Sequence, residues 1–136
     1  MIYVNHKWYK GRLTFNLDGL IVDSTSHKQY KHMLPNEISV DNINRAYSEG
    51  WYIVVVTDRY KSYTNGNIDL PTQMGHNETK QWLRKFGVNF NELVFGDSLK
   101  DVYVSNNVCS IETMDDWNNN FWPLLKKLEE KDAKSM

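Results

Sequence analysis

The stretch that most restricts the fold is "WYIVVVT", residues 51–57, an unbroken run of aromatic and β-branched side chains closed by a threonine. A strand with one solvated face alternates apolar and polar residues, whereas a continuous apolar run is typical of a strand buried on both faces. Such strands lie in the middle of parallel sheets whose two faces are both covered. The run therefore predicts the centre of an α/β sheet.

Two helical patterns flank this strand. Residues 39–50 have apolar side chains at helical spacing, with Ser39 as the predicted N-cap and Gly50 as the stop. Residues 76–87 form a second pattern that ends at Gly87. The inward faces are predicted to hold Val40, Ile43, Ala46 and Tyr47 in the first helix and Trp82, Leu83 and Phe86 in the second.

The two ends of the chain add further elements. Residues 1–12 predict an N-terminal strand or hairpin extension, with a turn at Lys10-Gly11 before the strand "RLTFNL" enters the core. "ELVFG" and "DVYVS" predict two more short strands. Residues 116–136 predict a C-terminal helix, restarted near Trp122 because of Pro123, and a frayed tail.

Strands that alternate with helices favour parallel sheets joined by right-handed crossovers. The fold predicted for residues 1–136 is therefore a single α/β domain, a three-layer Rossmann-like parallel sheet with helices on both faces. In such sheets, ligands bind beyond the carboxyl ends of the strands. That rule selects four loops, one after each predicted core strand: residues 16–19, 57–59, 96–100 and 105–107.

Composition excludes several classes of protein. The chain is 40% hydrophobic and carries a net charge of −1, which gives no basis for non-specific binding to nucleic acid or to an anionic membrane. No apolar run approaches the length of roughly 20 residues that a membrane span needs. The single cysteine, Cys109, excludes an internal disulfide framework and fits a reducing compartment, so a cytoplasmic protein is expected.

The segment "FNLDGLIVD", residues 15–23, resembles the FDxDGTLxD motif of the haloacid dehalogenase (HAD) superfamily. "YIVVVTDR" is similar to the family's strand that ends in Ser/Thr, and "ETKQWLRKFGVNFNELVFG" to its next helix-strand unit. "DVYVSNN" is similar to its strand that ends in an acidic pair. The resemblance covers residues 13–115 and points to small phosphatases of the capsule-biosynthesis type, with a minimal cap. It implies a HAD-like sheet and Mg²⁺-dependent transfer of a phosphoryl group to an aspartate.

Carried over position by position, the resemblance assigns roles to individual residues. Asn16 occupies the position of the nucleophile, and Asp18 occupies that of the general acid/base. The positions implied for phosphate binding are Thr57, Asp58 and Lys100. The positions implied for Mg²⁺ binding are Asn16, Asp18, Ser105 and Asn106.

Three of the four motifs depart from the family pattern. Asn16 replaces the attacking carboxylate, Asp97 stands where the family has a lysine, and Ser105-Asn106 replaces the acidic pair. Removal of the nucleophile alone lowers hydrolase rates by on the order of 10⁴–10⁶, and neutral ligands hold Mg²⁺ weakly. The sequence therefore predicts an inactive pseudophosphatase without a cofactor. It would bind an unknown protein partner or a small anionic ligand through the former active-site cleft.

Alternatives stay open. An atypical Mg²⁺-dependent phosphatase, acting on a small phosphorylated metabolite such as a sugar phosphate, would need other carboxylates beside Asp18 and would use Lys100 as its lysine. The replacement acids would come from Asp23, Asp58, Asp97 and Asp101. Asp18 also has a structural interpretation, as a cap for backbone N–H groups in its turn. The chain is expected to be a monomer or a homodimer, the latter formed through the N-terminal hairpin or the C-terminal helix.

Overall fold

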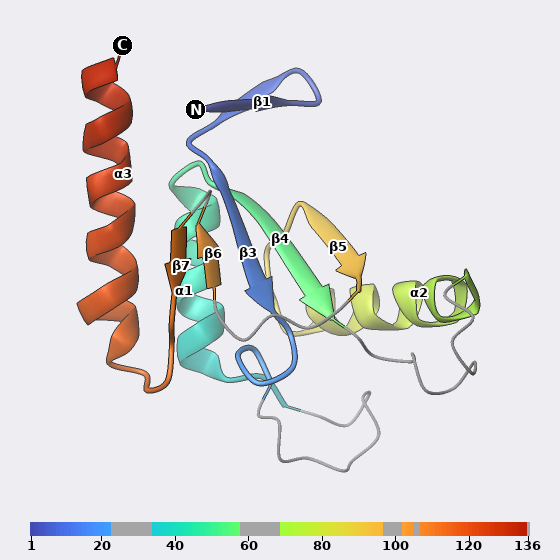
Figure 1. Ribbon diagram of the computed structural model, residues 1–136. Helices are drawn as coiled ribbons and strands as arrows, with labels where there is room; N and C mark the ends of the chain where they lie inside the picture. Colours follow the sequence, from blue (N-terminus) through green and yellow to red (C-terminus); the bar gives the residue numbers. More distant parts are fainter. Residues whose placement is uncertain (23–33, 58–68, 97–101, 105–106, 136) are drawn as a thin grey trace.

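The computed structural model describes residues 1–22, 34–57, 69–96, 102–104 and 107–135, and for 69–76 and 133–135 it describes the backbone only. The order of the elements along the chain is β1, β2, β3, α1, β4, α2, β5, β6, β7, η3 and α3 (Figure 1). Five of the strands form one sheet in the order β5-β4-β3-β6-β7, and β1 and β2 form a separate two-stranded sheet.

The sheet is mixed, so the prediction of an all-parallel sheet is wrong. The three strands β3 (Arg12–Asn16), β4 (Tyr52–Thr57) and β5 (Glu92–Phe95) are parallel. By contrast, β6 (Val102–Val104) is antiparallel to β3, and β7 (Asn107–Cys109) is antiparallel to β6. A parallel return needs a crossover of about a dozen residues or more. Only residues 96–101 separate β5 from β6, so the chain has no length for one.

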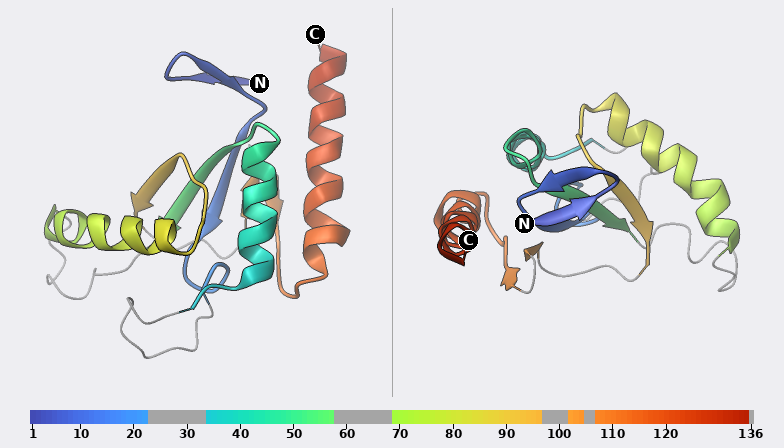
Figure 2. Two further views of the ribbon diagram at one scale, coloured as in Figure 1. Left: turned by 180° about the vertical axis from the view of Figure 1, so that it is seen from behind. Right: turned by 90° about the horizontal axis from the view of Figure 1, so that it is seen from above.

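The described helices α1 (Glu37–Ser48), α2 (Asp69–Lys85) and α3 (Trp122–Ser135) lie on one face of the sheet (Figures 1 and 2). Right-handed crossovers explain this for α1 and α2: the steps β3→β4 and β4→β5 run in the same direction across the sheet, so both helices fall on the same face. Over the described ranges the architecture has two layers, and the predicted three layers with helices on both faces are wrong.

The core lies between this helical layer and the sheet. Every residue of β4 is buried, as the continuous apolar run predicts. Phe15 of β3 contacts two aromatic residues near the C-terminus, with its ring centroid 6.1 Å from that of Trp117 and 5.9 Å from that of Phe121. The predicted inward residues Val40, Ile43, Ala46, Trp82 and Leu83 are buried, Phe86 packs against them, and Cys109 is buried as well. Tyr47, predicted to face inward, is 40% exposed.

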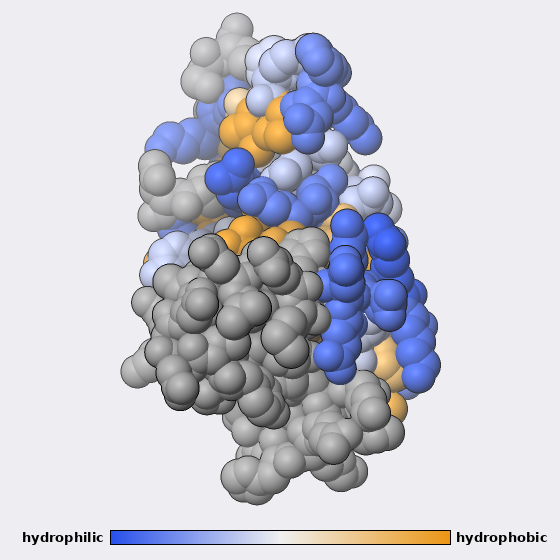
Figure 3. Space-filling view, turned by 90° about the vertical axis from the view of Figure 1, so that its right-hand side faces the viewer, coloured by the Kyte–Doolittle hydropathy of each residue, from blue (hydrophilic) through white to orange (hydrophobic). Residues whose placement is uncertain are grey.

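On the opposite face of the sheet, Val94, Tyr103 and Val108 remain 36%, 40% and 51% exposed. The side of the molecule on which α2 and β5 lie is shown in Figure 3. There, hydrophilic side chains cover most of the coloured surface, and hydrophobic ones form small separate areas. Within the described ranges, no helix is long and apolar enough to cross a membrane.

The helix boundaries follow local chemistry. Helix α1 begins at Glu37 because the Asn36 side chain accepts hydrogen bonds from the backbone N–H groups of Ile38 and Ser39, so the predicted cap at Ser39 is wrong. Gly50, with φ +100°, ends it as predicted. Helix α2 begins seven residues before the predicted residue 76, and Pro71 is tolerated in its first turn because the N–H groups there have no helical acceptor.

The N-terminal hairpin has its own turn, ahead of the predicted turn at Lys10-Gly11. Strands β1 (Ile2–Val4) and β2 (Lys7–Tyr9) pair around Asn5 and His6, whose φ values of 50° and 66° are those of the two-residue turn that hairpins favour. Lys10-Gly11 joins β2 to β3, with a bend at Lys10, and the Lys10 N–H donates to the Gly50 carbonyl over 2.9 Å.

The C-terminal region begins with a short π-helix, η3 (Trp117–Phe121), which continues into α3. The helix restarts at Trp122, as Pro123 predicted. It extends to Ser135, so the tail predicted to be frayed is largely helical.

Asp116 stabilises the start of this region. Its Oδ2 accepts hydrogen bonds from the backbone N–H groups of Glu112 and Thr113, and these bonds, the one from Thr113 foremost, hold the pKa of Asp116 below its ordinary value of 3.8.

The lowered pKa of Asp116 makes stability depend on pH. A carboxyl group whose pKa is lowered by folding stabilises the folded state when the pH is above its ordinary pKa. This contribution is lost as the pH falls through the pKa of the folded state. We expect acidification below pH 3.8 to loosen the start of η3, and the Asp116→Asn protein to lose this pH dependence. Amide exchange at Glu112 and Thr113 would measure it, and equal profiles for the two proteins would contradict it.

Candidate functional site

The candidate site is built where the two central strands end. Asn16 is the last residue of β3, and it lies beside Val56 of β4 in the parallel register. The chain then turns back on itself: the Gly19 N–H donates to the Val22 carbonyl over 2.6 Å, and the Val22 N–H donates to the Leu17 carbonyl over 2.9 Å. Gly19 has φ +98°, a left-handed conformation that glycine adopts without strain. This tight turn holds Asp18 over the end of the sheet.

Asp18 meets Thr57 at this point. Thr57 is the last residue of β4 and is fully buried, and its Oγ1 donates a hydrogen bond of 2.7 Å to Oδ2 of Asp18. The structure thus brings together two side chains that the sequence placed in one site. A hydroxyl has a single donor proton, so while this bond lasts the Thr57 hydroxyl cannot donate to a bound oxyanion.

Asn16 completes the group through its amide. Its Nδ2 donates to the backbone carbonyl of Asp18 over 2.5 Å. Its Oδ1 is buried, and none of the described residues donates a hydrogen bond to it. An amide contributes no nucleophilic electron pair comparable to that of a carboxylate. At this position the side chain can hold the turn and accept a hydrogen bond, and it cannot form an acyl phosphate.

The carboxyl end of β5 reaches the same edge of the sheet. The Gly96 N–H donates to the Thr57 carbonyl over 2.9 Å, directly after the end of β5. The residues predicted to continue the site from β4 and β5 lie outside the described part of the chain: Asp58, Asp97, Lys100 and Asp101. The same holds for Asp23, Ser105 and Asn106.

The carboxyl end of β6 does not lie at this edge of the sheet. Its last residue, Val104, pairs with Leu13, near the start of β3, whereas Asn16 is at the end of β3. The prediction that four carboxyl ends converge is therefore wrong for β6, because the strand is antiparallel. In the described ranges, no group of three or more His, Cys, Asp and Glu side chains is arranged to hold a metal ion.

A second concave site was missed by the sequence reasoning. It lies between α1 and the η3–α3 segment and includes Arg45, Asn118 and Trp122. Trp122 is partly buried and packs against the hydrophobic core. The proline at 123 signalled the break in the helix, but no sequence pattern pairs Trp122 with an arginine far away in the chain.

Comparison with known proteins supports the fold alone. A crystal structure of a target protein from Vibrio cholerae matches with a TM-score of 0.66 and 19% sequence identity, over 90% of this chain and 98% of that one. No protein-family model matches the chain, and no curated protein matches it. At this identity the match establishes an α/β fold and assigns no function.

Proposed function

We propose that the chain is a catalytically inactive protein of the HAD type, a pseudophosphatase that binds a partner at the ends of β3 and β4. The observation on which the proposal rests is the side-chain amide of Asn16 and the hydrogen bond that it donates. At the position where the resemblance requires an attacking carboxylate, the chain has an amide whose Nδ2 donates to the Asp18 carbonyl.

The surroundings of Asn16 support the same conclusion. The Asp18 carboxylate accepts from the Thr57 hydroxyl, which gives both side chains a structural use that needs no substrate. The antiparallel direction of β6 turns the carboxyl end of that strand away from Asn16, so a Mg²⁺ site of the implied kind has fewer contributors at this edge. Mg²⁺ sites in proteins use one or two carboxylates together with water and substrate phosphates.

We propose a protein as the partner rather than a small anion. Among the described side chains at the strand ends, the charged group is the Asp18 carboxylate, which accepts hydrogen bonds. A partner that presents N–H groups, from its backbone or from a basic side chain, matches this acceptor.

The direct test is a phosphatase assay on the unmodified protein. With Mg²⁺ present, we expect hydrolysis of p-nitrophenyl phosphate and of a panel of sugar phosphates to stay at the uncatalysed rate, because no nucleophile is available. The Asn16→Ala protein, which cannot attack phosphorus either, is the matched control and should give the same rate. A Mg²⁺-dependent rate in the unmodified protein, well above the rate without protein, would reject the proposal, whether or not Asn16→Ala shares it.

The alternative function is an atypical Mg²⁺-dependent phosphatase. It is favoured by the Thr57–Asp18 hydrogen bond, which keeps an acid and a hydroxyl together at the strand ends. This alternative requires Mg²⁺ as its cofactor and predicts that Asp18→Ala abolishes turnover. Activity that survives Asp18→Ala would exclude it.

A further inference from the structure

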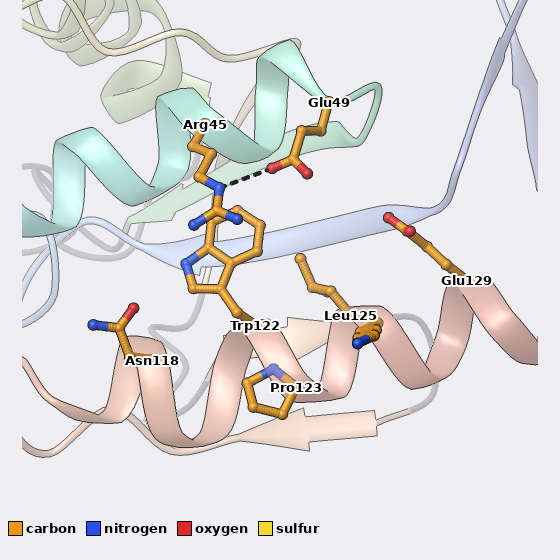
Figure 4. A pocket seen from close by; sticks show the side chains of 8 residues that line it. Arg45, Glu49, Asn118, Trp122, Pro123, Leu125 and Glu129 are labelled. Carbon is orange, nitrogen blue, oxygen red and sulfur yellow. Dashed lines mark hydrogen bonds and ion pairs between the residues drawn. The ribbon is translucent and has the colours of Figure 1, made fainter.

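The groove between α1 and the η3–α3 segment has a volume of about 640 Å³, within the range of small-molecule sites. Figure 4 shows Arg45 and Glu49 on the α1 side, and Asn118, Trp122 and Pro123 on the opposite side. These residues are distinct from those at the ends of β3 and β4, so a ligand of this groove is independent of the proposed pseudophosphatase site.

The centre of the groove is an arginine stacked on a tryptophan. The Arg45 guanidinium carbon lies 3.9 Å from the centroid of the Trp122 ring (Figure 4). Both groups are held in place: Arg45 Nε donates to Glu49 Oε2 over 3.1 Å, and Trp122 Nε1 donates to Asn42 Oδ1 over 2.7 Å. A guanidinium fixed flat in this way loses little freedom when it binds.

Hydrogen-bond donors face the groove from three elements. A guanidinium has five N–H donors, and Arg45 uses one of them on Glu49, with no other acceptor among the described residues. Asn118 of η3 and Lys126 of α3 also line the groove, and their side chains have no described hydrogen-bond partner. The Arg45 side chain is 59% exposed, so a ligand has access to it.

The groove lining carries two cations and two carboxylates, and Lys10, which pairs with Glu129 from outside the lining, adds a third cation. Each carboxylate already has a cation: Glu49 pairs with Arg45, and Glu129 pairs with Lys10 over 3.0 Å. Lys126 then remains as a cation without a described ion pair. An anionic ligand is the charge complement of this arrangement.

The rest of the groove is flat and apolar. Trp122, Pro123 and the buried Leu125 contribute apolar surface, and the free face of a stacked guanidinium accepts an aromatic ring. The π-helix η3, a rare element that occurs often at functional sites, places Asn118 on the groove together with Trp122. Its position is a second reason to regard this groove as a binding site.

We propose that the groove binds a small organic anion, a carboxylate or a phosphate monoester that carries a flat ring. The anionic group binds Asn118 and Lys126, and the ring stacks on the face of the Arg45 guanidinium.

The test is an NMR titration of the ¹⁵N-labelled protein with benzoate, phenyl phosphate and inorganic phosphate. The indole N–H signal of Trp122 is identified by its absence in Trp122→Phe. We expect this signal to shift saturably with benzoate or phenyl phosphate, and Arg45→Gln to weaken binding by about ten- to a hundredfold. The comparison of benzoate with phenyl phosphate identifies the headgroup. Asn118→Ala and Lys126→Gln should weaken binding too, and both leave the Arg45–Trp122 stack intact.

Arg84→Gln is the matched control, because Arg84 is an exposed arginine in the last turn of α2 and does not line the groove. It should bind the probes as the unmodified protein does. The proposal is overturned if no probe shifts the Trp122 signal at millimolar concentration, or if Arg45→Gln, Asn118→Ala and Lys126→Gln all bind unchanged. Inorganic phosphate binding as tightly as phenyl phosphate would exclude the stacked ring.

Discussion

Replacing Trp117 with alanine is expected to lower the free energy of unfolding by about 3–5 kcal/mol, the usual range for removing a buried aromatic side chain. Trp117 is 1% exposed and joins the C-terminal region to the sheet through Phe15, and its ring centroid lies 5.0 Å from that of Phe121. The deletion leaves a cavity at the junction of β3 and η3. Because a domain is stable by only about 5–15 kcal/mol, the loss is a large share of the total.

Urea unfolding followed by far-ultraviolet circular dichroism would measure this effect, since the other tryptophans complicate fluorescence. Trp8→Ala is the matched control: Trp8 is 61% exposed on β2, and its removal should change stability by less than about 1 kcal/mol. The loss of unfolding free energy in Trp117→Phe should be well below that in Trp117→Ala, because phenylalanine keeps most of the apolar contact. It also removes an indole N–H that is buried without a described acceptor. Equal losses for Trp117→Ala and Trp8→Ala would contradict the central position of Trp117.

Replacing Asn16 with aspartate is expected to destabilise the protein by about 1–3 kcal/mol at neutral pH in the absence of a divalent ion. The substitution removes the Nδ2 donor from the Asp18 carbonyl and places a second carboxylate beside that of Asp18. The buried Oδ1 has no described donor to stabilise a negative charge. Burial and the neighbouring anion raise the pKa of the new carboxyl group above its ordinary range.

The direction of the pH dependence follows from this raised pKa. The carboxyl group is neutral in both states at low pH, so the part of the destabilisation that comes from charge should vanish below pH ~4 and grow as the pH rises. Mg²⁺ should recover part of the loss, because two adjacent carboxylates suit a hard cation better than one does. Urea unfolding at pH 4 and pH 7, with Mg²⁺ or with a chelator, would measure both effects.

The Asn16→Ala protein separates the effect of the added charge on stability from the effect of the lost hydrogen bond. It should destabilise the protein by about 1 kcal/mol, with no dependence on pH or Mg²⁺. If Asn16→Asp instead leaves stability unchanged at neutral pH with a chelator present, the site already accommodates two carboxylates. The structural interpretation of Asn16 would then be wrong.

The elements that are set by residues close together in the chain could be predicted from the sequence. The apolar run of β4 predicted a strand buried on both faces, and Gly50 and Gly87 predicted the ends of two helices. Thr57 and Asp18 were predicted to share a site, because parallel strands bring their carboxyl ends to one edge. In each case the deciding interaction is local, or follows from a general rule of parallel sheets.

The tertiary structure alone decided the rest. The direction of β6 depends on the short connection between β5 and β6. The alternating pattern of its residues would be the same in a parallel and in an antiparallel strand. The placement of α1 and α2 on one face follows from the order of the strands, which the sequence does not state. Arg45 and Trp122 meet because α1 packs beside α3. Local propensity sets which residues form a strand or a helix, whereas pairing direction and packing are set by contacts between residues far apart in the chain.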